Sequence, residues 1–446
     1  MKMPLLLKNA DLVTQNADRA VLRGSLLVDD GRIIDIGPDL HYPDAEEIDL
    51  SGLTVIPGLI QSHIHLCQAL FRNLADDLEL LDWLRRYIWP LEKAHTPDSL
   101  RASARLGLHE LLASGVTTVL DMGCMHHMPV VFEELDTSGI RAFCGKVLMD
   151  AGEQPYKEST AAAIADTEAL IQEWHGHADG RIRYALAPRF VPTCSDALWE
   201  AVRGLSRDHG LLIHTHSSEN RSEIALVEQL TGLRNIQFFV DRGLAGPELL
   251  LAHCIWLDDA EMAALADHDI KVLHCPAANL KLGSGFAPIP PMLERGITVA
   301  IGSDGAPCNN NLDIFTEMRL AALIHKPAHG VTAIRAGDVF DMATINGARA
   351  LGLADQIGSL EPGKQADLTI LDLHKVHASP VDNVISQIVY SAQARDVRHV
   401  MVNGRWVVRE GTVLAYPDPA AIVDAALEEC ASLLEFIRKD SASPAN

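Results

Sequence analysis

The stretch LTVIPGLIQSHIH (residues 53–65) is an apolar run that ends in two histidines one residue apart. Seven similar runs follow along the chain: VTTVLDMG (116–123), RAFCGKVL (141–148), RIRYALAPRF (181–190), GLLIHTH (210–216), LLLAHC (249–254), IKVLHCP (270–276) and ITVAIGSD (297–304). Longer stretches with helical periodicity separate them, such as 99–114 and 161–175. Eight alternations of strand and helix predict an α/β protein built on a (β/α)8 TIM-like barrel.

Both ends of the chain have a different pattern, with short strands joined by turns. LLVDDGRIIDIG (26–37) has the pattern of two strands around an Asp-Gly turn, and HVMVNGRWVVREGTVL (399–414) repeats this style around an Asn-Gly turn. We therefore predict that residues 1–56 and 360–415 pair as one small β-sandwich domain. Residues 57–359 then form the barrel, and residues 416–446 form a C-terminal helix and tail.

The formal net charge of -23 over 446 residues argues against two classes of partner. A surface this acidic repels nucleic acid and anionic lipid, and no segment approaches the roughly 20 apolar residues that span a bilayer. The eight cysteines are scattered and form no C-x-x-C pair, so we expect buried free thiols in a reducing cytoplasm. These features predict a cytoplasmic protein that acts on small molecules.

Metal-binding residue types fall at the C-terminal ends of the predicted strands. His63 and His65 end the first run, and later runs end in His216, His253, His274 and Asp304. The catalytic residues of a barrel lie at that face, and residues two apart in a strand point the same way. His63 and His65 are therefore predicted to face the barrel axis together.

Two imidazoles from one strand, a third from another strand and one carboxylate form a suitable ligand set for a divalent metal. We predict that His63, His65, His216 and Asp304 bind Zn²⁺, with Fe²⁺ as the alternative. The competing interpretation is that an H-x-H pair arises by chance among 20 histidines, and that an aspartate before glycine is a turn residue. The shared position at strand ends favours the metal site.

The stretch LLIHTHSSEN (211–220) contains two histidines that compete for the ligand role. His214 and His216 point the same way, so their parity does not distinguish them. His216 lies about 6–7 Å nearer the C-terminal end of the strand. We therefore assign the ligand to His216 and an inner, supporting position to His214.

Three residues at this face are candidates for catalysis: Glu219, His253 and Asp304. A metal lowers the pKa of water bound to it toward neutrality. Glu219 lies just beyond its strand and can take the proton from water and pass it to a leaving group. His253 can stabilise the tetrahedral intermediate. The competing interpretation places Glu219 in the capping region of the next helix.

These residues lie in longer motifs that resemble the metal-dependent deaminase branch of the amidohydrolase superfamily. That branch holds 5-methylthioadenosine/S-adenosylhomocysteine and 5'-deoxyadenosine deaminases, guanine deaminase and s-triazine hydrolases. The matching pieces span nearly the whole chain: PGLIQSHIHLCQ (57–68), DWLRRYIWPLE (82–92), GVTTVLDMG (115–123), APRF (187–190), HTHSSEN (214–220), LAHCIWL (251–257), HCPAANLKLGSG (274–285), GSDGAPCNNNLDIFTEMRLAALI (302–324) and GSLEPGKQADLTILD (358–372).

The resemblance implies the same four ligands, with Glu219 as the proton shuttle and His253 beside the metal. It also implies one metal rather than two. Binuclear relatives bridge two metals with a lysine at the end of the fourth strand, and here that strand ends in Ala187-Pro188-Arg189. Lys146, near the end of the third strand, is interpreted as structural.

The resemblance gives mixed indications of the substrate. Gln68 and Arg189 match guanine deaminase-like proteins, and an amide with a guanidinium suits an oxo-purine or a pterin. The stretch 303–324, and Asp82 before Trp83, instead resemble adenosine-type enzymes, although those usually have histidine where this chain has Arg189. Trp83 either lines the pocket or belongs to the core. The candidate substrate contacts are Gln68, Asp82, Trp83, Arg189 and His253.

Together, the residues and the resemblance predict an aminohydrolase of purine nucleoside metabolism that cleaves C–N bonds in cyclic amidines. The preferred substrates are adenosine-type compounds: 5'-deoxyadenosine, 5-methylthioadenosine and S-adenosylhomocysteine. A guanine, oxo-purine or pterin deaminase and an s-triazine amino- or chlorohydrolase remain as alternatives. We expect a homo-oligomer, either a dimer or a tetramer. His126 and His127 are assigned to a loop, and His274 to a supporting or pocket position.

Overall fold

The computed structural model describes residues 3–152, 154 and 156–442. Residues 1–2, 153, 155 and 443–446 lie outside the described part. The start of the predicted β-sandwich domain and the end of the predicted C-terminal tail are among them. No helix in the described part combines the length and the apolar character needed to cross a membrane. All eight cysteines are free thiols, and all but Cys430 are buried.

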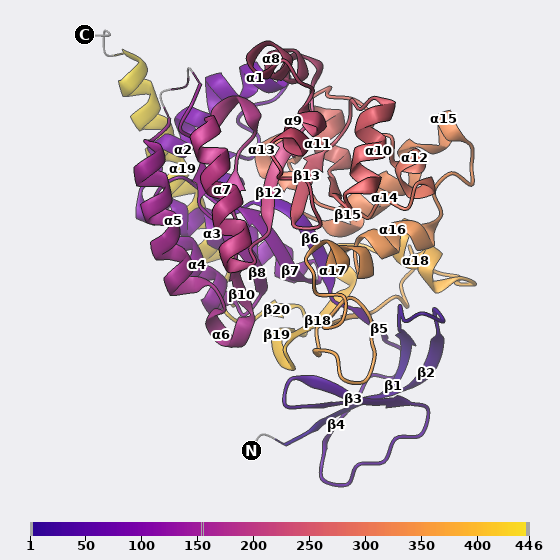
Figure 1. Cartoon of the computed structure of the whole chain (residues 1–446). Helices are drawn as coiled ribbons and strands as arrows, with labels where there is room; N and C mark the ends of the chain where they lie inside the picture. The colour runs from indigo at the N-terminus through magenta and orange to yellow at the C-terminus, as the bar shows by residue number, and fades with distance from the viewer. Residues whose placement is uncertain (1–2, 153, 155, 443–446) are drawn as a thin grey trace.

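Parallel strands with helices on their outer side make up the middle of the chain (Figure 1). Each of the eight predicted runs contains at least one strand. These strands are almost entirely buried, as expected where helices cover them. They are β6 (Leu59–His65), β7 (Val116–Met122), β8 (Arg141–Gly145), β9 (Val147–Leu148), β10 (Ile182–Tyr184), β11 (Ala187–Pro188), β12 (Ile213–Ser217), β13 (Leu249–His253), β14 (Lys271–His274), β15 (Val299–Ile301) and β16 (Asp304–Gly305).

Within the described ranges, these strands form three parallel sheets, ordered β10-β8-β7-β6-β16, β11-β9 and β12-β13-β14-β15. A parallel bridge between Leu186 and Ile213 connects the segment after β10 to β12. The last predicted run has two neighbours, because β15 pairs with β14 and β16 pairs with β6. This α/β arrangement brings the C-terminal ends of β6, β12 and β13 to one side, together with β16.

The helices that alternate with these strands begin and end at recognisable signals. α3 begins with a capping box between Thr96 and Ser99, and α7 ends at Gly210, whose φ of 65° suits glycine. The helices are α1 (Leu80–Trp83), α2 (Trp89–Ala94), α3 (Pro97–Ala113), α4 (Met128–Ser138), α5 (Thr160–Trp174), α6 (His177–Gly180), α7 (Asp196–His209), α8 (Arg221–Thr231), α9 (Asn235–Asp241), α10 (Asp259–Asp267), α11 (Pro276–Lys281), α12 (Ile289–Glu294), α13 (Ala306–Asn309), α14 (Ile314–Ile324), α15 (Lys326–His329), α16 (Ala336–Met342), α17 (Ile345–Ala350), α18 (Val384–Tyr390) and α19 (Pro419–Ala442). A π-helical turn, Leu84–Ile88, joins α1 to α2.

The two ends of the chain meet in one nine-stranded network, which we call the end sheet (Figure 1). Antiparallel pairing of β5 with β17, with Pro57 opposite Leu368, joins the two ends. Apolar side chains from both ends, including Leu12 and Ile370, share one buried cluster. Strands from both ends of the chain therefore lie in one sheet. The strands are β1 (Leu5–Val13), β2 (Val21–Asp29), β3 (Arg32–Gly37), β4 (Glu46–Asp49), β5 (Thr54–Pro57), β17 (Leu368–Leu371), β18 (Val397–Val402), β19 (Arg405–Arg409) and β20 (Thr412–Val413).

The C-terminal helix α19 lies against α3 and α2 (Figure 1). Ala426 and Leu433 of this helix are buried in the same apolar cluster as Leu70 and Trp89. The predicted terminal helix therefore returns to the segments that surround the parallel strands and covers apolar surface there.

A buried ion pair connects β8 to the end sheet. Nε and Nη2 of Arg141 donate to the two carboxylate oxygens of Asp367 at 2.8 and 3.0 Å, and the backbone N–H of Asn403 donates to Oδ1 of Asp367 at 2.8 Å. Arg141 and Asp367 are 3% and 4% exposed. Two parallel hydrogen bonds make this a well-aligned bidentate pair.

Asp367→Asn is expected to lower the free energy of unfolding by about 3–5 kcal/mol, because it leaves the Arg141 guanidinium buried without its countercharge. The matched control is Lys8→Met, which breaks an exposed pair with Glu47 and should cost less than about 1 kcal/mol. Urea denaturation followed by circular dichroism measures both losses. Equally small losses would show that the buried pair does not stabilise this junction.

Candidate metal centre and active site

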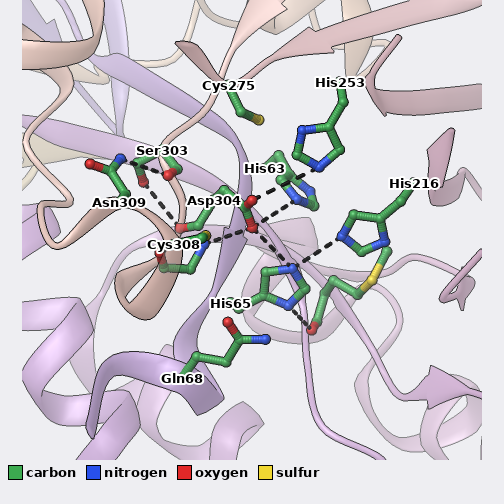
Figure 2. Close-up of polar contacts among 12 residues, drawn as sticks. His63, His65, Gln68, His216, His253, Cys275, Ser303, Asp304, Cys308 and Asn309 are labelled. Atoms are coloured by element: carbon green, nitrogen blue, oxygen red, sulfur yellow. Dashed lines mark hydrogen bonds and ion pairs between the residues drawn. The ribbon is translucent and has the colours of Figure 1, made fainter. Parts of the chain in front are cut away.

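Four side chains from three strands surround one point in the structure (Figure 2). Nε2 of His63 and Nε2 of His65 each lie 3.3 Å from Oδ1 of Asp304. Nε2 of His65 also lies 3.3 Å from Nε2 of His216. One possible ligand atom from each of the four residues lies within 4.8 Å of the others. The residues predicted to bind metal are therefore together in space.

Backbone carbonyls hold two of these imidazoles in the tautomer that suits metal binding. Nδ1 of His65 donates to the carbonyl oxygen of Met122 at 3.2 Å, and Nδ1 of His216 donates to the carbonyl oxygen of Arg189 at 2.7 Å. Each Nε2 therefore carries a lone pair. Two lone pairs that face each other at 3.3 Å repel, and a cation between them removes that repulsion.

Three of the separations between donor atoms suit ligands of one bound ion, and all four donor atoms lie within 4.8 Å of one another. Zn–N bonds of about 2.0–2.1 Å place neighbouring ligand atoms about 3.3–3.4 Å apart, close to the 3.3 Å separations found here. Nε2 of His63 is buried and has no hydrogen-bond partner among the described residues. A metal would satisfy this atom. Three imidazoles and one carboxylate thus fit a divalent metal.

His214 supports the cluster from the inner side. Its Nε2 lies 2.6 Å from Nδ1 of His63, and His214 is fully buried. When Nε2 of His63 binds a metal, its Nδ1 donates this hydrogen bond and His214 accepts it. The contact would hold the His63 ring in one orientation, in keeping with the supporting position predicted for His214.

Two residues of the site have a left-handed backbone that residues other than glycine rarely adopt. The φ angle is 74° at His253 and 62° at Asp304. Such conformations cost of order ~1–3 kcal/mol and persist only where the surrounding structure imposes them. At both strand ends this backbone turn accompanies a side chain that points toward the cluster (Figure 2).

Burial and neighbouring groups give the ionisable residues contrasting proton affinities. Burial lowers the pKa of His63 to about 4, so the imidazole is neutral at pH 7. Burial alone would raise the pKa of Asp304, but the adjacent His63 and His65 hold this pKa well below its usual value. Burial, followed by the nearby charge of Asp304, raises the pKa of Glu219 well above its usual value. One carboxyl group therefore suits metal binding, and the other suits proton transfer.

Glu219 and His253 meet beside the cluster. Oε2 of Glu219 lies 3.5 Å from Nε2 of His253, which lies 3.9 Å from Oδ2 of Asp304. Nδ1 of His253 donates to Oδ1 of Asn279 at 2.8 Å, so Nε2 of the neutral ring carries the lone pair. The cap of α8 is Asn220 rather than Glu219. The capping interpretation of Glu219 is therefore not what the structure shows.

A cavity of about 20 Å³ lies over these groups. This is room for a water molecule, so a heterocycle can enter only if apolar side chains of the lining move. Asp82 lies on the exposed side of α1 and is not part of the lining, whereas the other four predicted substrate contacts are. The lining consists of His65, Gln68, Leu80, Trp83, Leu84, Arg189, Phe190, His216, Glu219, His253 and Asp304.

Sequence analysis does not single out two residues that hold the site together. Asn279 fixes the tautomer of His253, and the buried Glu92 bonds to both Gln68 and Arg189. Glu92 ends the motif DWLRRYIWPLE, but a glutamate in a helix is usually exposed. Only its burial in the folded chain reveals its contacts.

The remaining candidates lie outside the cluster. Nζ of Lys146 donates to Glu158 and Asp166, both at 2.9 Å, which is a structural role. His126 and His127 are exposed. His274 is buried, and neither of its ring nitrogens has a partner among the described residues.

His216→Ala is expected to reduce bound metal well below one ion per chain, because it removes one of the donor atoms at 3.3 Å. His274→Ala is the matched control: it removes another histidine from a neighbouring strand end and should retain the metal. Plasma mass spectrometry after dialysis against a weak chelator measures both contents. Full metal in His216→Ala, or equal loss in both variants, would contradict the assigned site.

Residues 54–407 match the Amidohydrolase family. The chain is 41% identical over 393 residues to the 5'-deoxyadenosine deaminase of Methanothermobacter thermautotrophicus, which covers 88% of this chain and 90% of that one. It is 38% identical over 416 residues to the 5-methylthioadenosine/S-adenosylhomocysteine deaminase of Syntrophobacter fumaroxidans, covering 92% and 94%. The structure of an adenosine deaminase from Xanthomonas campestris with bound zinc has a TM-score of 0.91 at 32% identity, covering 98% of both chains. Family match and relatives agree: the chain belongs to the amidohydrolase family.

Proposed function

We propose that this amidohydrolase is a metal-dependent deaminase of adenosine-type nucleosides, which replaces the ring amino group by oxygen and releases ammonia. The candidate substrates are 5'-deoxyadenosine, 5-methylthioadenosine and S-adenosylhomocysteine, the compounds in the names of the relatives. The observation that carries the proposal is the placement of Glu219 beside both His253 and the four-residue cluster. Glu219 can therefore transfer protons next to the position where the attacking water would lie.

His63, His65, His216 and Asp304 would hold the metal, for which we propose zinc, the ion bound in the Xanthomonas campestris structure. A divalent metal bound there supplies a Lewis acid that lowers the pKa of water toward neutrality. The ligands are suited to this in advance, because burial lowers the pKa of His63 and of His216 and keeps both imidazoles neutral, while the Asp304 carboxylate is ionised.

Glu219 would carry the proton through the reaction. Its carboxylate takes a proton from the attacking water, whose oxygen bonds to the carbon that bears the amino group. Glu219 passes this proton to the ring nitrogen, then takes the proton of the newly added hydroxyl group and delivers it to the amino group. The C–N bond breaks, a C=O bond forms in its place, and ammonia leaves. Burial raises the pKa of Glu219 well above its usual value, which makes this carboxylate a stronger proton acceptor than an exposed one. Nε2 of His253, which lies 3.5 Å from Oε2 of Glu219, would orient the reacting groups.

Gln68, Trp83, Arg189 and His253 are our proposed substrate contacts, because all four line the cavity. Asp82 would contribute only after α1 turns, since its side chain is exposed. Leu80, Trp83 and Leu84 lie in the segment of the lining that must move to admit a nucleoside.

We also propose that the three parallel sheets form one closed (β/α)8 barrel over residues 57–359. The bridge between Leu186 and Ile213 and the pairing of β16 with β6 support this closure. Residues 1–56 and 360–415 would form the β-sandwich domain, and 416–446 the C-terminal helix and tail. The free thiols support the predicted cytoplasmic location, which stays a prediction. The homo-oligomer also stays a prediction.

The zinc-loaded protein is expected to release ammonia from at least one of the three adenosine-type compounds, with the ultraviolet change from an amino- to an oxo-purine. Guanine, pterins and amino- or chlorotriazines form the comparison panel in the same assay. Turnover of guanine or a triazine, with none of the three nucleosides, would replace the proposal by the corresponding alternative.

Glu219→Gln should keep the metal and lose turnover by about 10²–10⁴-fold, because it removes the proton shuttle while preserving shape. Glu261→Gln is the control: Glu261 is equally buried but bonds to Arg234 in another part of the chain, so activity should be unchanged. Steady-state kinetics with metal analysis measures both. Turnover near the original rate in Glu219→Gln would rule out its role.

A further inference from the structure

Glu92 lies behind the substrate cavity and bonds to two residues that line it. Oε1 of Glu92 accepts a hydrogen bond from Nε2 of Gln68 at 2.8 Å, and Oε2 accepts one from Nη1 of Arg189 at 2.6 Å. Glu92 is 2% exposed and is not itself part of the lining. One carboxylate therefore holds two neighbouring parts of the cavity wall.

The bond to Glu92 determines which end of the Gln68 amide faces the site. A carboxylate only accepts hydrogen bonds, so the NH₂ group of Gln68 must turn toward Glu92. The carbonyl oxygen Oε1 is then buried without a hydrogen-bond partner among the described residues. It lies against Gly305, where a Cβ atom would be 2.1 Å from it. Gln68 thus presents an unsatisfied acceptor beside the strand that carries Asp304 (Figure 2).

The bond to Arg189 has two consequences. It places a countercharge on a guanidinium that is 3% exposed, which would otherwise be buried alone. It also holds the residue whose backbone carbonyl accepts the hydrogen bond from Nδ1 of His216. Glu92 therefore holds the side chain of Arg189, and the backbone carbonyl of the same arginine orients the proposed metal ligand His216.

We infer that Glu92 is a positioning residue for substrate recognition. It orients the Gln68 amide so that its oxygen can accept a hydrogen bond, and it balances the charge of Arg189, which can donate one. The wall then selects a ligand with an N–H or O–H group opposite Gln68 and an acceptor opposite Arg189. A nucleoside offers both, through its hydroxyl groups and ring nitrogens. The inference deepens the proposed function and rests on it for the identity of the ligand, but the orientation of Gln68 does not depend on the ligand.

Glu92→Gln tests this role in the zinc-loaded enzyme. An amide at position 92 can donate as well as accept, so the Gln68 amide is no longer held one way round. KM should rise about tenfold, the effect expected when one buried hydrogen-bonding group loses its alignment. The value of kcat should stay within about threefold, because Glu219 and the four proposed ligands keep their own side chains. Metal content is measured in parallel, because Arg189 also orients His216.

Glu134→Gln is the matched control. Glu134 is also buried and also bonds to arginines, Arg101 and Arg105, but it lies on α4 and contacts α3 rather than the cavity. This variant should lose stability with KM and kcat unchanged. An equal KM in Glu92→Gln and Glu134→Gln would overturn the inference, since both would then be structural changes alone.

A second measurement does not depend on turnover. In the ¹⁵N-labelled wild-type protein, the side-chain amide of Gln68, identified by its loss in Gln68→Met, should exchange slowly with solvent, because it donates to a buried carboxylate. Rapid exchange would overturn the inference even if the enzyme deaminates nucleosides. If the amide exchanges slowly but the protein turns over none of the three nucleosides, the proposed function is wrong. The orientation of Gln68 would still be supported.

Discussion

The 3.3 Å separation between Nε2 of His65 and Nε2 of His216 is the constraint around which the rest of the site is arranged. In both rings the single N–H is at Nδ1 and donates to a backbone carbonyl. Neither Nε2 therefore has a proton to donate to the other. A cation resolves the conflict, and Asp304 supplies the negative charge that suits it. Since β6 and β16 pair side by side although more than two hundred residues separate them in sequence, a bound metal would join the first and last parallel strands.

Two carboxyl groups on one side of the fold acquire opposite properties from their surroundings. Asp304 lies between imidazoles that favour its ionised form, whereas Glu219 is buried near another negative charge, which favours the protonated form. The left-handed backbone at Asp304 and His253 accompanies side chains that point toward the same cluster (Figure 2). The conformational free energy that this backbone costs at Asp304 and His253 is therefore associated with the arrangement of the reacting groups.

The layer behind the cavity matters as much as the lining. His214 holds His63, Asn279 holds His253, and Glu92 holds the pair Gln68 and Arg189. Each contact fixes a tautomer, a ring or an amide that the reaction or the recognition of a ligand would use. The apolar part of the lining is different in kind. Leu80, Trp83 and Leu84 line the cavity from a buried apolar cluster, so packing holds them rather than hydrogen bonds to a second layer.

Strand-end histidines, the H-x-H pair and the spacing from His216 to Glu219 could be predicted from the sequence, because local periodicity decides which side chains share a face. Apolar runs in the sequence also located strands β6 to β16, and the composition of the last segment located the terminal helix α19. Short-range patterns could not show that Asp82 is exposed or that Glu92 is buried, because both are acids in adjoining helical segments with similar local signals. Nor could they show that Asn279 bonds to His253. The sequence by itself thus determined which residues are available at one face of the fold. Only the tertiary structure decided their tautomers, charges and partners, because these depend on burial and on atoms that lie far apart along the chain.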